Sequence, residues 1–380
     1  MSIVYLDHAA TSWPKPEEVK RAVLDALEHG GNPGRSGHRL SLHAARLVSQ
    51  ARHLVSQLLN APSSASVAFT LNATDALNMA INGLVRPGDH VITTCFDHNS
   101  VLRPLSHLAK QSSIELTVLE APDGLTVRVE QFEQAIRNNT AMIAVSHASN
   151  VTGALLDVQA VSDLCQSHGI KLLLDASQTL GAMPIDVQAL RPACLAAPGH
   201  KCLFGPQGTG LLYVRPDVEL AFWRVGGTGS ASHQVWHPEF MPDRLEAGTP
   251  NTPGLAGLAA GVEWLLRQGL KQVSKHELGL TERLRAGLQQ IPGVTVYGPG
   301  GQQGVGVVSV NLAGWDAADL SVALEDDYGI ISRPGLHCAP LAHQAIGTFP
   351  AGTVRLSVGY SNTAEDVDWA IRALAELSAR

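Results

Sequence analysis

The segments IKLLLDASQ at residues 170–178 and PGHK at residues 198–201 decide the fold. The first is an apolar run that ends in an acid, Asp175, and the second is a tight polar turn between apolar stretches. A short continuous apolar run is typical of a strand that is buried on both faces of a parallel sheet. Ligands of such sheets bind outside the carboxyl ends of the strands, which is where Asp175 lies. The two segments therefore predict an α/β protein with a ligand site at that edge.

Lys201 and Asp175 together suggest which ligand binds there. A lysine among glycine, proline and apolar neighbours favours a lowered pKa and an amine that attacks a carbonyl. We infer a pyridoxal 5'-phosphate site in which Lys201 forms the Schiff base. Asp175 would pair with the pyridinium nitrogen, so that the ring accepts electrons. The alternative is a surface lysine and an ordinary strand-ending aspartate, and these two segments alone favour neither interpretation.

The composition is that of an ordinary globular protein. The chain has 380 residues, enough for two domains and a large core, with 45% hydrophobic and 16% charged residues. A net charge of −7 without a dense Lys/Arg block argues against nucleic acid as a partner. The N-terminus lacks the pattern of a signal peptide, and no apolar run approaches the roughly 20 residues that span a bilayer. We therefore expect a soluble, cytoplasmic protein that binds neither nucleic acid nor membrane.

The cysteines favour a reducing compartment. They are odd in number, scattered, and form no CxxC pair, which argues against a disulfide framework or a zinc ribbon. His337, Cys338 and His343 resemble soft metal ligands, but no fourth ligand has suitable spacing, so we expect no metal. Cys202 is interpreted as a core or incidental residue because its side chain should point away from that of Lys201. The five cysteines are Cys95, which we expect to be buried, Cys165, Cys194, Cys202 and Cys338.

Short β-rich runs alternate with helical patterns from about residue 66 to residue 214, which predicts βαβ units and a mainly parallel sheet. No GxGxxG follows a strand and opens a helix, and no GxxxxGK[ST] occurs, which argues against a nucleotide loop. Strands are expected at residues 66–70, 90–95, 141–145, 171–174 and 208–214, and helices at residues 39–60 and 75–84.

The last third of the chain predicts a smaller α+β domain. Helices are expected at residues 255–269 and 274–291, the second with Ser274 as its N-cap, and strands at residues 304–312 and 353–358. Gly, Thr and Pro are frequent at residues 226–229 and 248–253, which we interpret as loops that close the first domain. The expected division is an N-terminal arm that packs on the small domain (1–14), a large cofactor-binding domain (15–250) and a small C-terminal domain (251–380).

Several polar groups follow the carboxyl ends of the expected strands. Residues 71–76 (LNATDA) lie between a strand and a helix, and Thr74 in the first turn could bind phosphate, although the segment alone fits a plain N-cap better. His98 is placed to stack on a pyridine ring. Asn150 and Gln178 could form hydrogen bonds with a phenolic oxygen. Their convergence at one edge of the sheet is a stronger indication than any one of them.

The sequence as a whole resembles the fold-type I pyridoxal phosphate enzymes, and among them the class V aminotransferase and cysteine desulfurase family. The EAGTPNT run at residues 246–252 is especially specific to this family. The resemblance covers nearly the whole chain and includes residues 5–11 (YLDHAAT), 32–38 (NPGRSGH), 147–150 (HASN), 175–178 (DASQ), 199–201 (GHK), 333–339 (RPGLHCA) and 355–357 (RLS).

The resemblance implies a role for each matching residue. Lys201 would be the Schiff-base lysine and would move the α-proton of the substrate as general acid–base, and Asp175 would pair with the ring nitrogen. Arg355 would hold the substrate carboxylate in a bidentate pair, with Asn150 near the substrate and the phenolic oxygen. The other implied cofactor contacts are Gln178, the stacking residue His98, and the phosphate ligands Thr74, His200 and, from the partner subunit of a dimer, the residue equivalent to Thr249. One departure is Pro198, where many desulfurases carry a serine, so one phosphate contact is lost or moved.

Cys338 separates the activities within this family. Residues 333–340 (RPGLHCAP) resemble the cysteine segment of the shorter-loop desulfurases, in which the cysteine attacks the substrate sulfur and becomes a persulfide. Attack needs a thiolate, and Arg333 and His337 could supply positive charge that lowers the pKa of the thiol. The alternative is a buried cysteine in a turn. Leu336 replaces the first of two histidines often found there, which puts substrate fit or acceptor docking in doubt.

The resemblance implies a homodimeric, pyridoxal phosphate-dependent cysteine desulfurase. L-Cysteine would give L-alanine, and the sulfur would pass to Cys338 and then to an acceptor protein. The alternatives are a selenocysteine lyase or cysteine sulfinate desulfinase, a class V aminotransferase or lyase that does not use Cys338, and a weak enzyme that mainly docks sulfur-transfer proteins. The sequence leaves open the acceptor and the pathway, whether iron–sulfur cluster assembly, thiolated cofactors or selenium handling.

Overall fold

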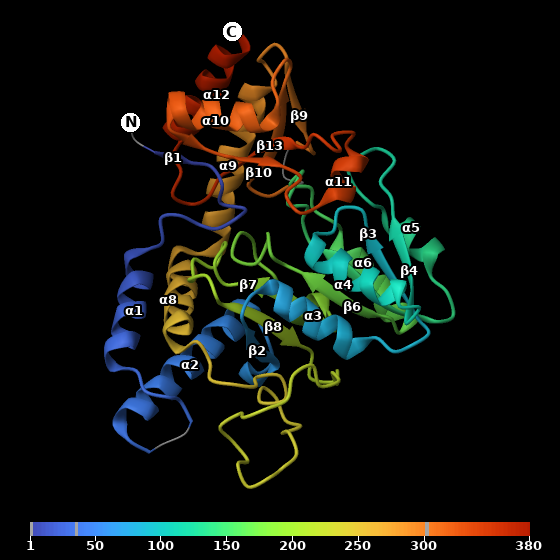
Figure 1. Ribbon diagram of the computed structural model, residues 1–380, viewed down its shortest axis with the longest axis vertical. Helices are drawn as coiled ribbons and strands as arrows, with labels where there is room; N and C mark the ends of the chain where they lie inside the picture. The colour runs from blue at the N-terminus through green and yellow to red at the C-terminus, as the bar shows by residue number, and fades with distance from the viewer. Residues whose placement is uncertain (1–2, 35–36, 301–303) are drawn as a thin grey trace.

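The computed structural model describes residues 3–34, 37–300 and 304–380, and its centre is a seven-stranded sheet (Figure 1). The strand order is β2-β8-β7-β6-β5-β3-β4. Strand β8 runs antiparallel to both of its neighbours, and all other pairs are parallel. The expected mainly parallel sheet is thereby confirmed. Its strands are β2 (Val67–Thr70), β3 (Asp89–Thr94), β4 (Ile114–Leu119), β5 (Thr140–Ser146), β6 (Lys171–Asp175), β7 (Cys194–Pro198) and β8 (Gly210–Val214).

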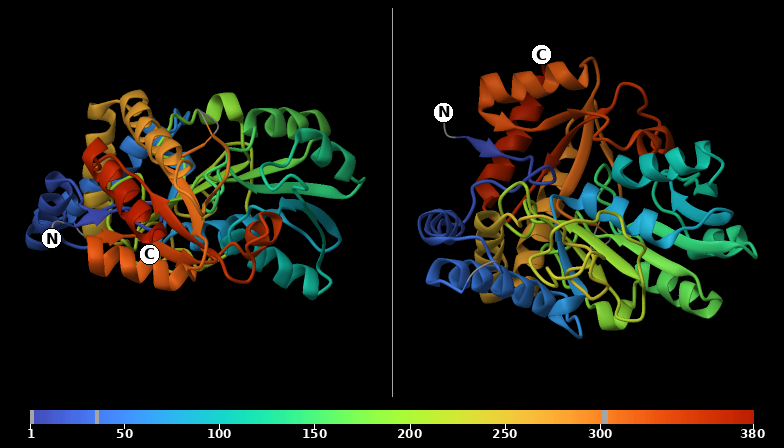
Figure 2. Two further views of the ribbon diagram at one scale, coloured as in Figure 1. Left: turned by 90° about the horizontal axis from the view of Figure 1, so that it is seen from above. Right: turned by 60° about the horizontal axis from the view of Figure 1, so that its bottom comes forward.

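Both faces of this sheet are covered by helices, which explains the unbroken apolar runs of its strands (Figure 2). In β6, Leu172 and Leu174 pack on one face with α2, α6 and α8, and Leu173 packs on the other face with α3 and α4. The helices of this part of the chain are α1 (Glu17–His29), α2 (Arg39–Leu58), α3 (Ala73–Leu84), α4 (Asn99–Lys110), α5 (Val129–Ala135), α6 (Val158–His168), α7 (Val187–Leu190) and α8 (Thr252–Gln268), with a short 3₁₀ turn at Ser64–Ser66.

A second, antiparallel sheet of four strands lies in the C-terminal third, in the order β12-β13-β10-β9. The apolar sides of α9, α10 and α12 pack together with residues of β10 and β13 in one cluster. The expected small α+β domain is therefore present. Its elements are α9 (Leu270–Leu288), β9 (Val294–Tyr297), β10 (Val307–Leu312), α10 (Ala317–Tyr328), β11 (Ile330–Ile331), β12 (Arg333–Gly335), α11 (Pro340–Ala345), β13 (Thr353–Ser357) and α12 (Ala364–Ser378).

The expectation that Ser274 caps the second C-terminal helix is wrong. Helix α9 begins at Leu270, four residues earlier, and its N-cap is Gly269, which offers no side chain for capping. Gly269 has a φ of 83°, a conformation that glycine adopts without strain, so the chain turns there directly from α8 into α9. Ser274 lies inside the helix. The strand expected from residue 304 begins later, at Val307.

The N-terminal arm packs on the C-terminal third of the chain, and the two lie together at the top of Figure 1. Strand β1 (Val4–Tyr5) pairs in parallel with β11, and Val4 and Leu6 belong to the apolar cluster of the small sheet. Helix α8 instead packs in the core of the large sheet. The division into residues 1–14, 15–250 and 251–380 stays a proposal, and this packing favours a later second boundary, near Gly269.

Two further expectations concern particular segments. Residues 35 and 36 of the expected NPGRSGH segment lie outside the described residues. No helix in the described part of the chain is long and apolar enough to cross a membrane.

Candidate active site

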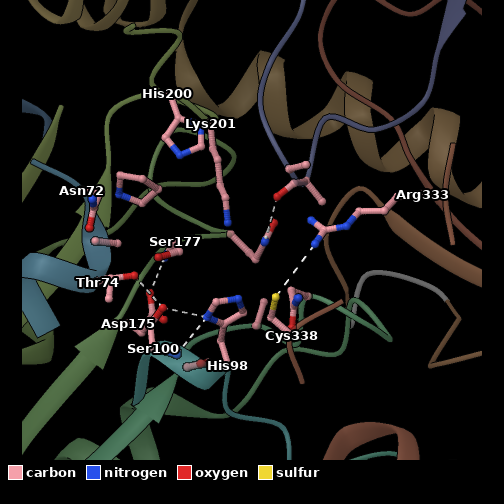
Figure 3. A pocket seen from close by; sticks show the side chains of 18 of the residues that line it. Asn72, Thr74, His98, Ser100, Asp175, Ser177, His200, Lys201, Arg333 and Cys338 are labelled. Atoms are coloured by element: carbon pink, nitrogen blue, oxygen red, sulfur yellow. Dashed lines mark hydrogen bonds between the residues drawn. The ribbon is translucent and has the colours of Figure 1, made fainter. Parts of the chain in front are cut away.

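A cavity of about 240 Å³ opens at the carboxyl ends of the parallel strands (Figure 3). Segments that follow β2, β3, β5, β6 and β7 contribute to it, and the N-terminal arm and the C-terminal domain close it from the other side. The structure brings together every expected site residue except Thr249. The polar lining consists of Asn72, Thr74, His98, Ser100, Ser146, Asn150, Asp175, Ser177, Gln178, His200, Lys201, Arg333, Cys338 and Arg355.

Lys201 points into this cavity, and its environment favours the neutral amine (Figure 3). Burial lowers the pKa of Lys201 to about 8, although the nearby carboxylate of Asp175 acts in the opposite direction. Asp175 ends β6, and its Oδ1 accepts a hydrogen bond of 2.9 Å from the backbone N–H of Ser177. An amine with a lowered pKa and a carboxylate are thus fixed at the ends of neighbouring strands, β7 and β6.

One side of the cavity has the donors that a phosphate group needs. Helix α3 begins there, with Asn72 as N-cap, and the Thr74 Oγ1 lies 2.8 Å from the Ser100 Oγ of helix α4. The Nδ1 of His200 is buried and has no partner among the described residues. Burial lowers the pKa of His200 to about 4, so this ring is neutral near pH 7. Pro198 lines the same cavity.

Sequence reasoning missed Asn72, Ser100 and Ser177. Asn72 and Ser177 lie next to residues that were singled out, and both follow strand ends. Ser100 has the same signal as Thr74, a hydroxyl in the first turn of a helix after a strand. That shared position could have identified it.

His98 presents a neutral, oriented ring to the cavity. It is the N-cap of α4, and its Nδ1 accepts a hydrogen bond of 3.1 Å from the backbone N–H of Ser100. Burial lowers the pKa of His98 to about 4. The preceding residue, Asp97, is fully buried and accepts hydrogen bonds of 2.8 Å from the hydroxyls of both Thr93 and Thr94. The carboxylate of Asp97 therefore holds the turn that places His98.

Arg355 lies on β13 with only 1% of its surface exposed. Its Nη2 donates to Asp7 Oδ1 at 2.7 Å, and its Nη1 donates to the backbone oxygen of Asn150 at 3.2 Å. The buried Nε has no partner among the described residues. Asp7 therefore already occupies part of the guanidinium fork, and a substrate carboxylate would bind through the N–H groups that remain.

The two expected amide residues hold neighbouring segments in place. Asn150 Nδ2 donates to the backbone oxygen of His337 at 2.7 Å, and Gln178 Nε2 donates to that of Ala9 at 3.2 Å. Each amide nitrogen keeps a second hydrogen. The Oδ1 of Asn150 is buried without a partner in the described part of the chain. Both side chains thus retain unused polar groups at the cavity.

Cys338 is exposed at the cavity wall, and its Sγ lies 4.0 Å from Arg333 Nη2 (Figure 3). Its backbone oxygen accepts a hydrogen bond of 2.8 Å from the N–H of Asn99, at the start of α4. The expectation that His337 supplies positive charge is wrong. Burial lowers the pKa of His337 to about 3, so its ring is neutral near pH 7. Arg333 is the cation beside this thiol.

Thr249 lies in a different hollow, of about 380 Å³. Glu246, three residues earlier, accepts hydrogen bonds from Arg52 at 2.6 and 2.9 Å and from the backbone N–H of Phe69 at 2.6 Å. The EAGTPNT run is thus fixed to the large domain at its glutamate, while Thr249 is exposed. Thr249 thus does not line the cavity of Lys201, and its expected role toward a partner subunit stays a prediction.

The other cysteines are not placed for chemistry. Cys95, Cys165 and Cys194 are buried, as expected for Cys95. Cys202 is partly exposed in a separate small cavity behind Lys201, where burial raises the pKa of its thiol to about 12. The described residues contain no cluster of three metal-ligating side chains.

Comparison with known proteins identifies the family. Residues 4–369 match the family model described as aminotransferase class-V. The chain is 35% identical to a probable cysteine desulfurase of Methanothermobacter thermautotrophicus, over 99% of this chain and 94% of that protein. It is 34% identical to a cysteine desulfurase of Escherichia coli O157:H7, over 99% of this chain and 94% of that protein.

Solved structures agree with this assignment. The apo cysteine desulfurase from Thermococcus onnurineus NA1 superposes with a TM-score of 0.93 at 32% identity, covering 99% of this chain and 95% of the other. The cysteine desulfurase CsdA from Escherichia coli, in a form described as S-sulfonic acid, gives 0.88 at 30% identity, covering 99% and 95%. The chain therefore belongs to the class V aminotransferase family of enzymes, in the part of that family that contains cysteine desulfurases.

Proposed function

We propose that this enzyme is a pyridoxal phosphate-dependent cysteine desulfurase that converts L-cysteine into L-alanine and takes the sulfur onto Cys338. The observation that carries the proposal is the shared cavity of Lys201, Arg355 and Cys338. A lyase or aminotransferase of this family needs the lysine and the arginine but no thiol. An exposed cysteine with a guanidinium 4.0 Å from its sulfur supports a sulfur acceptor instead.

The residues around the cavity fit pyridoxal phosphate. Hydroxyls at two helix N-termini, Thr74 and Ser100, and the unpartnered Nδ1 of His200 suit a phosphate group. Asp175 suits a protonated pyridine nitrogen, and the neutral ring of His98 suits stacking on an aromatic face. When bound, this cofactor supplies an electron sink for the carbon atoms of an amino acid substrate.

Three side chains of this enzyme would then each carry out one part of the reaction. Arg355 binds the substrate carboxylate, sharing its guanidinium with Asp7. Lys201, with a pKa of about 8, removes and returns a proton at carbon near neutral pH. The thiolate of Cys338 attacks the substrate sulfur, so that an S–S bond forms and the C–S bond breaks. The electron pair of that bond returns to carbon, which takes a proton and leaves as alanine.

We further propose a homodimer with its interface near Thr249. Several large apolar side chains are exposed on the long loop before this residue, including Val235 at 98% and Trp236 at 86%. Exposed apolar surface of this kind is typical of a protein–protein contact. A second copy would cover the loop and bring its own Thr249 toward the phosphate side of the cavity. All five cysteines are unpaired, which supports a reducing compartment such as the cytoplasm.

The test is a substrate screen with the purified, cofactor-loaded enzyme. Alanine and sulfide are measured with cysteine, selenocysteine and cysteine sulfinate, each with and without a thiol reductant, for the wild type, Cys338→Ser and the matched control Cys202→Ser. A desulfurase forms alanine from cysteine and depends on Cys338 but not on Cys202. Preference for selenocysteine or cysteine sulfinate would reassign the substrate. Full activity of Cys338→Ser would favour a lyase or aminotransferase.

A further inference from the structure

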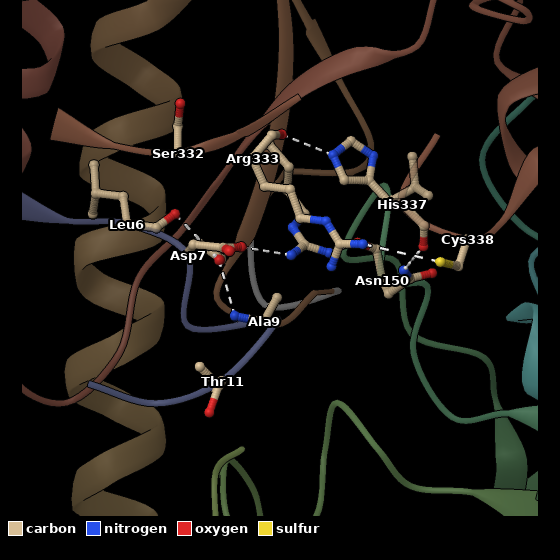
Figure 4. A network of polar contacts seen from close by, with 12 residues as sticks. Leu6, Asp7, Ala9, Thr11, Asn150, Ser332, Arg333, His337 and Cys338 are labelled. Atoms are coloured by element: carbon tan, nitrogen blue, oxygen red, sulfur yellow. Dashed lines mark hydrogen bonds and ion pairs between the residues drawn. The ribbon is translucent and has the colours of Figure 1, made fainter. Parts of the chain in front are cut away.

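Three buried polar side chains form a chain of hydrogen bonds behind Cys338. The ring of His337 contacts the backbone oxygen of Arg333 (Figure 4), and its Nε2 lies 2.9 Å from that oxygen. His337 Nδ1 lies 3.2 Å from His343 Nε2, and His343 Nδ1 lies 2.7 Å from Thr348 Oγ1. His343 is completely buried, and His337 and Thr348 are nearly so. We call this set of three side chains the histidine relay.

The direction of every bond in the histidine relay follows from its first member. A backbone carbonyl only accepts, so Nε2 of His337 carries a hydrogen, and in a neutral ring Nδ1 is then an acceptor. His343 must therefore donate from Nε2 and accept at Nδ1, and Thr348 must donate its hydroxyl hydrogen. With both rings neutral, no other assignment satisfies all three contacts.

Burial, more than the surrounding charges, keeps the histidine relay neutral. Burial is the largest cause that lowers the pKa of His337, the guanidinium groups of Arg355 and Arg333 act in the same direction, and the hydrogen bond to the Arg333 backbone oxygen acts in the opposite direction. The Asn150 amide donates to the backbone oxygen of His337. Burial likewise lowers the pKa of His343 to about 4. A proton added to His337 would force His343 to reverse both of its hydrogen bonds, next to two guanidinium groups. Both ring nitrogens of His337 are engaged, so neither one is available to the thiol.

The histidine relay joins both ends of the segment that carries Cys338. Its carbonyl acceptor, Arg333, begins β12, and the guanidinium of the same residue lies beside the Cys338 sulfur. At the other end, His343 lies in α11 and Thr348 in the turn that follows. His337 and Cys338 both have positive φ values, 51° and 59°, a left-handed conformation that is unfavourable for a non-glycine residue. Such a conformation persists only where other contacts hold it.

We propose that His343 and Thr348 are positioning residues for Cys338. Their hydrogen bonds fix the ring of His337 in one tautomer and one orientation, with both ring nitrogens engaged and neither available to the thiol. The catalytic importance of this arrangement rests on the proposed desulfurase function. The arrangement itself does not, because the geometry and ionisation of the Cys338 thiol are measurable without substrate.

The experiment follows alkylation of Cys338 by iodoacetamide from pH 5.5 to 9.5 in cofactor-loaded enzyme without cysteine, with the modified peptide quantified by mass spectrometry. His343→Leu removes the donor to His337 Nδ1, and His343→Gln keeps an amide N–H near that position. His168→Leu, at the exposed end of α6, is the control. Thr348→Val and Thr348→Ser form a milder pair, because serine keeps the hydroxyl donor.

The wild type should show one ionisation, that of the thiol. His343→Leu should keep this single ionisation, because burial and the two guanidinium groups still oppose a proton on His337, but it should change the rate at pH 8 by about fivefold, the effect of one lost hydrogen bond. His343→Gln, Thr348→Ser and the control should stay within about twofold of the wild type. The alkylation rate of Thr348→Val should lie between those of the control and of His343→Leu. This variant tests the proposal if His343→Leu does not fold.

Steady-state kinetics with cysteine distinguishes a misplaced Cys338 thiol from a general disturbance of the active site. His343→Leu should lower kcat by about tenfold and leave KM within about twofold, since Arg355 is unaffected. Wild-type alkylation rates in both His343→Leu and Thr348→Val would overturn the proposal. If these profiles change as expected but the wild type makes no alanine, the histidine relay stands and the proposed function fails.

Discussion

The enzyme places its two reactive side chains in different structural settings. Lys201 belongs to the lysine turn, residues 198–201, which follows β7, an interior strand between β6 and β8. Cys338 belongs to the cysteine loop, residues 333–338, which begins with β12, an edge strand of the small sheet. Backbone hydrogen bonds fix the lysine turn, since Gly199 N–H donates to the Thr209 oxygen at 2.8 Å. The cysteine loop is paired with β13 only through residues 333–335, and beyond them it relies on side chains as well as on the backbone N–H of Asn99.

This difference predicts different sensitivities. The lysine turn is packed so closely that a side chain at Gly199 would overlap Thr209, so its geometry is part of the fold. The cysteine loop has two left-handed residues and relies on Asn99, Asn150 and the histidine relay. The fold therefore presets the amine, whereas a few separate contacts set the position of the thiol. Substitutions can test each half of this comparison.

The largest effect is expected from Lys201→Ala. A positioned general acid–base group contributes about 10²- to 10⁴-fold, so alanine formation should fall by about 10³-fold or more. The wild type loaded with pyridoxal phosphate should be yellow, absorbing well beyond the protein band, through the cofactor attached to Lys201. Absorption and phosphate content after dialysis measure how much cofactor the variant retains relative to the wild type. A wild type that stays colourless after reconstitution contradicts the cofactor assignment.

Cys338→Ser should abolish sulfur transfer while leaving the absorption of the bound cofactor intact. Rapid-quench measurement of alanine should show a burst of about one equivalent per active site in the wild type, as expected for a covalent intermediate on the enzyme. The burst should disappear in the variant. Because contacts at both ends hold the cysteine loop, we also expect persulfide removal to limit turnover and a thiol reductant to accelerate it. Linear alanine release, indifferent to reductant, would show that this step is not limiting.

The sequence predicted the lysine half of the site better than the cysteine half. Asp175 and Lys201 follow β6 and β7, and their position at the strand ends follows from local pattern, even though β7 itself was missed because CLAAP has no β-branched residue. The ion pair between Arg355 and Asp7 joins residues 348 positions apart, and no local sequence pattern predicts it. The neutral state of His337 depends on burial and on Arg355, which lies 18 positions later on another strand. The hydrogen bond between His337 and His343 joins two residues that the spacing suggested only as metal ligands.

Arg355→Ala should raise the KM for cysteine by about tenfold or more, because a bidentate charged pair is stronger than a single neutral hydrogen bond. Arg355→Lys should not restore the affinity fully, since an ammonium lacks the planar fork. The ion pair with Asp7 adds a second consequence. Asp7→Asn should lower the KM or leave it unchanged, because it frees the guanidinium from a competing carboxylate. Unchanged KM in both arginine variants would show that the substrate carboxylate binds elsewhere.

The smallest expected effect concerns the ionisation of Lys201, and it tests whether the fold presets the amine. Capture of pyridoxal phosphate by the cofactor-free protein requires the neutral amine, so its rate should rise with pH around a midpoint near 8, well below the ordinary value of 10.5. The sign follows from burial, which disfavours the ammonium form, against Asp175, which favours it. Asp175→Asn removes the favourable carboxylate and should move the midpoint lower still.

At pH 7 the wild-type rate should be about tenfold below its plateau, since the midpoint lies one unit higher. Stopped-flow absorption measures this rate, with Cys338→Ser as the control that leaves the midpoint unchanged. A midpoint near 10.5 would mean that the folded lysine turn does not lower the pKa of Lys201. The amine, like the Cys338 thiol, would then depend on contacts outside its own turn.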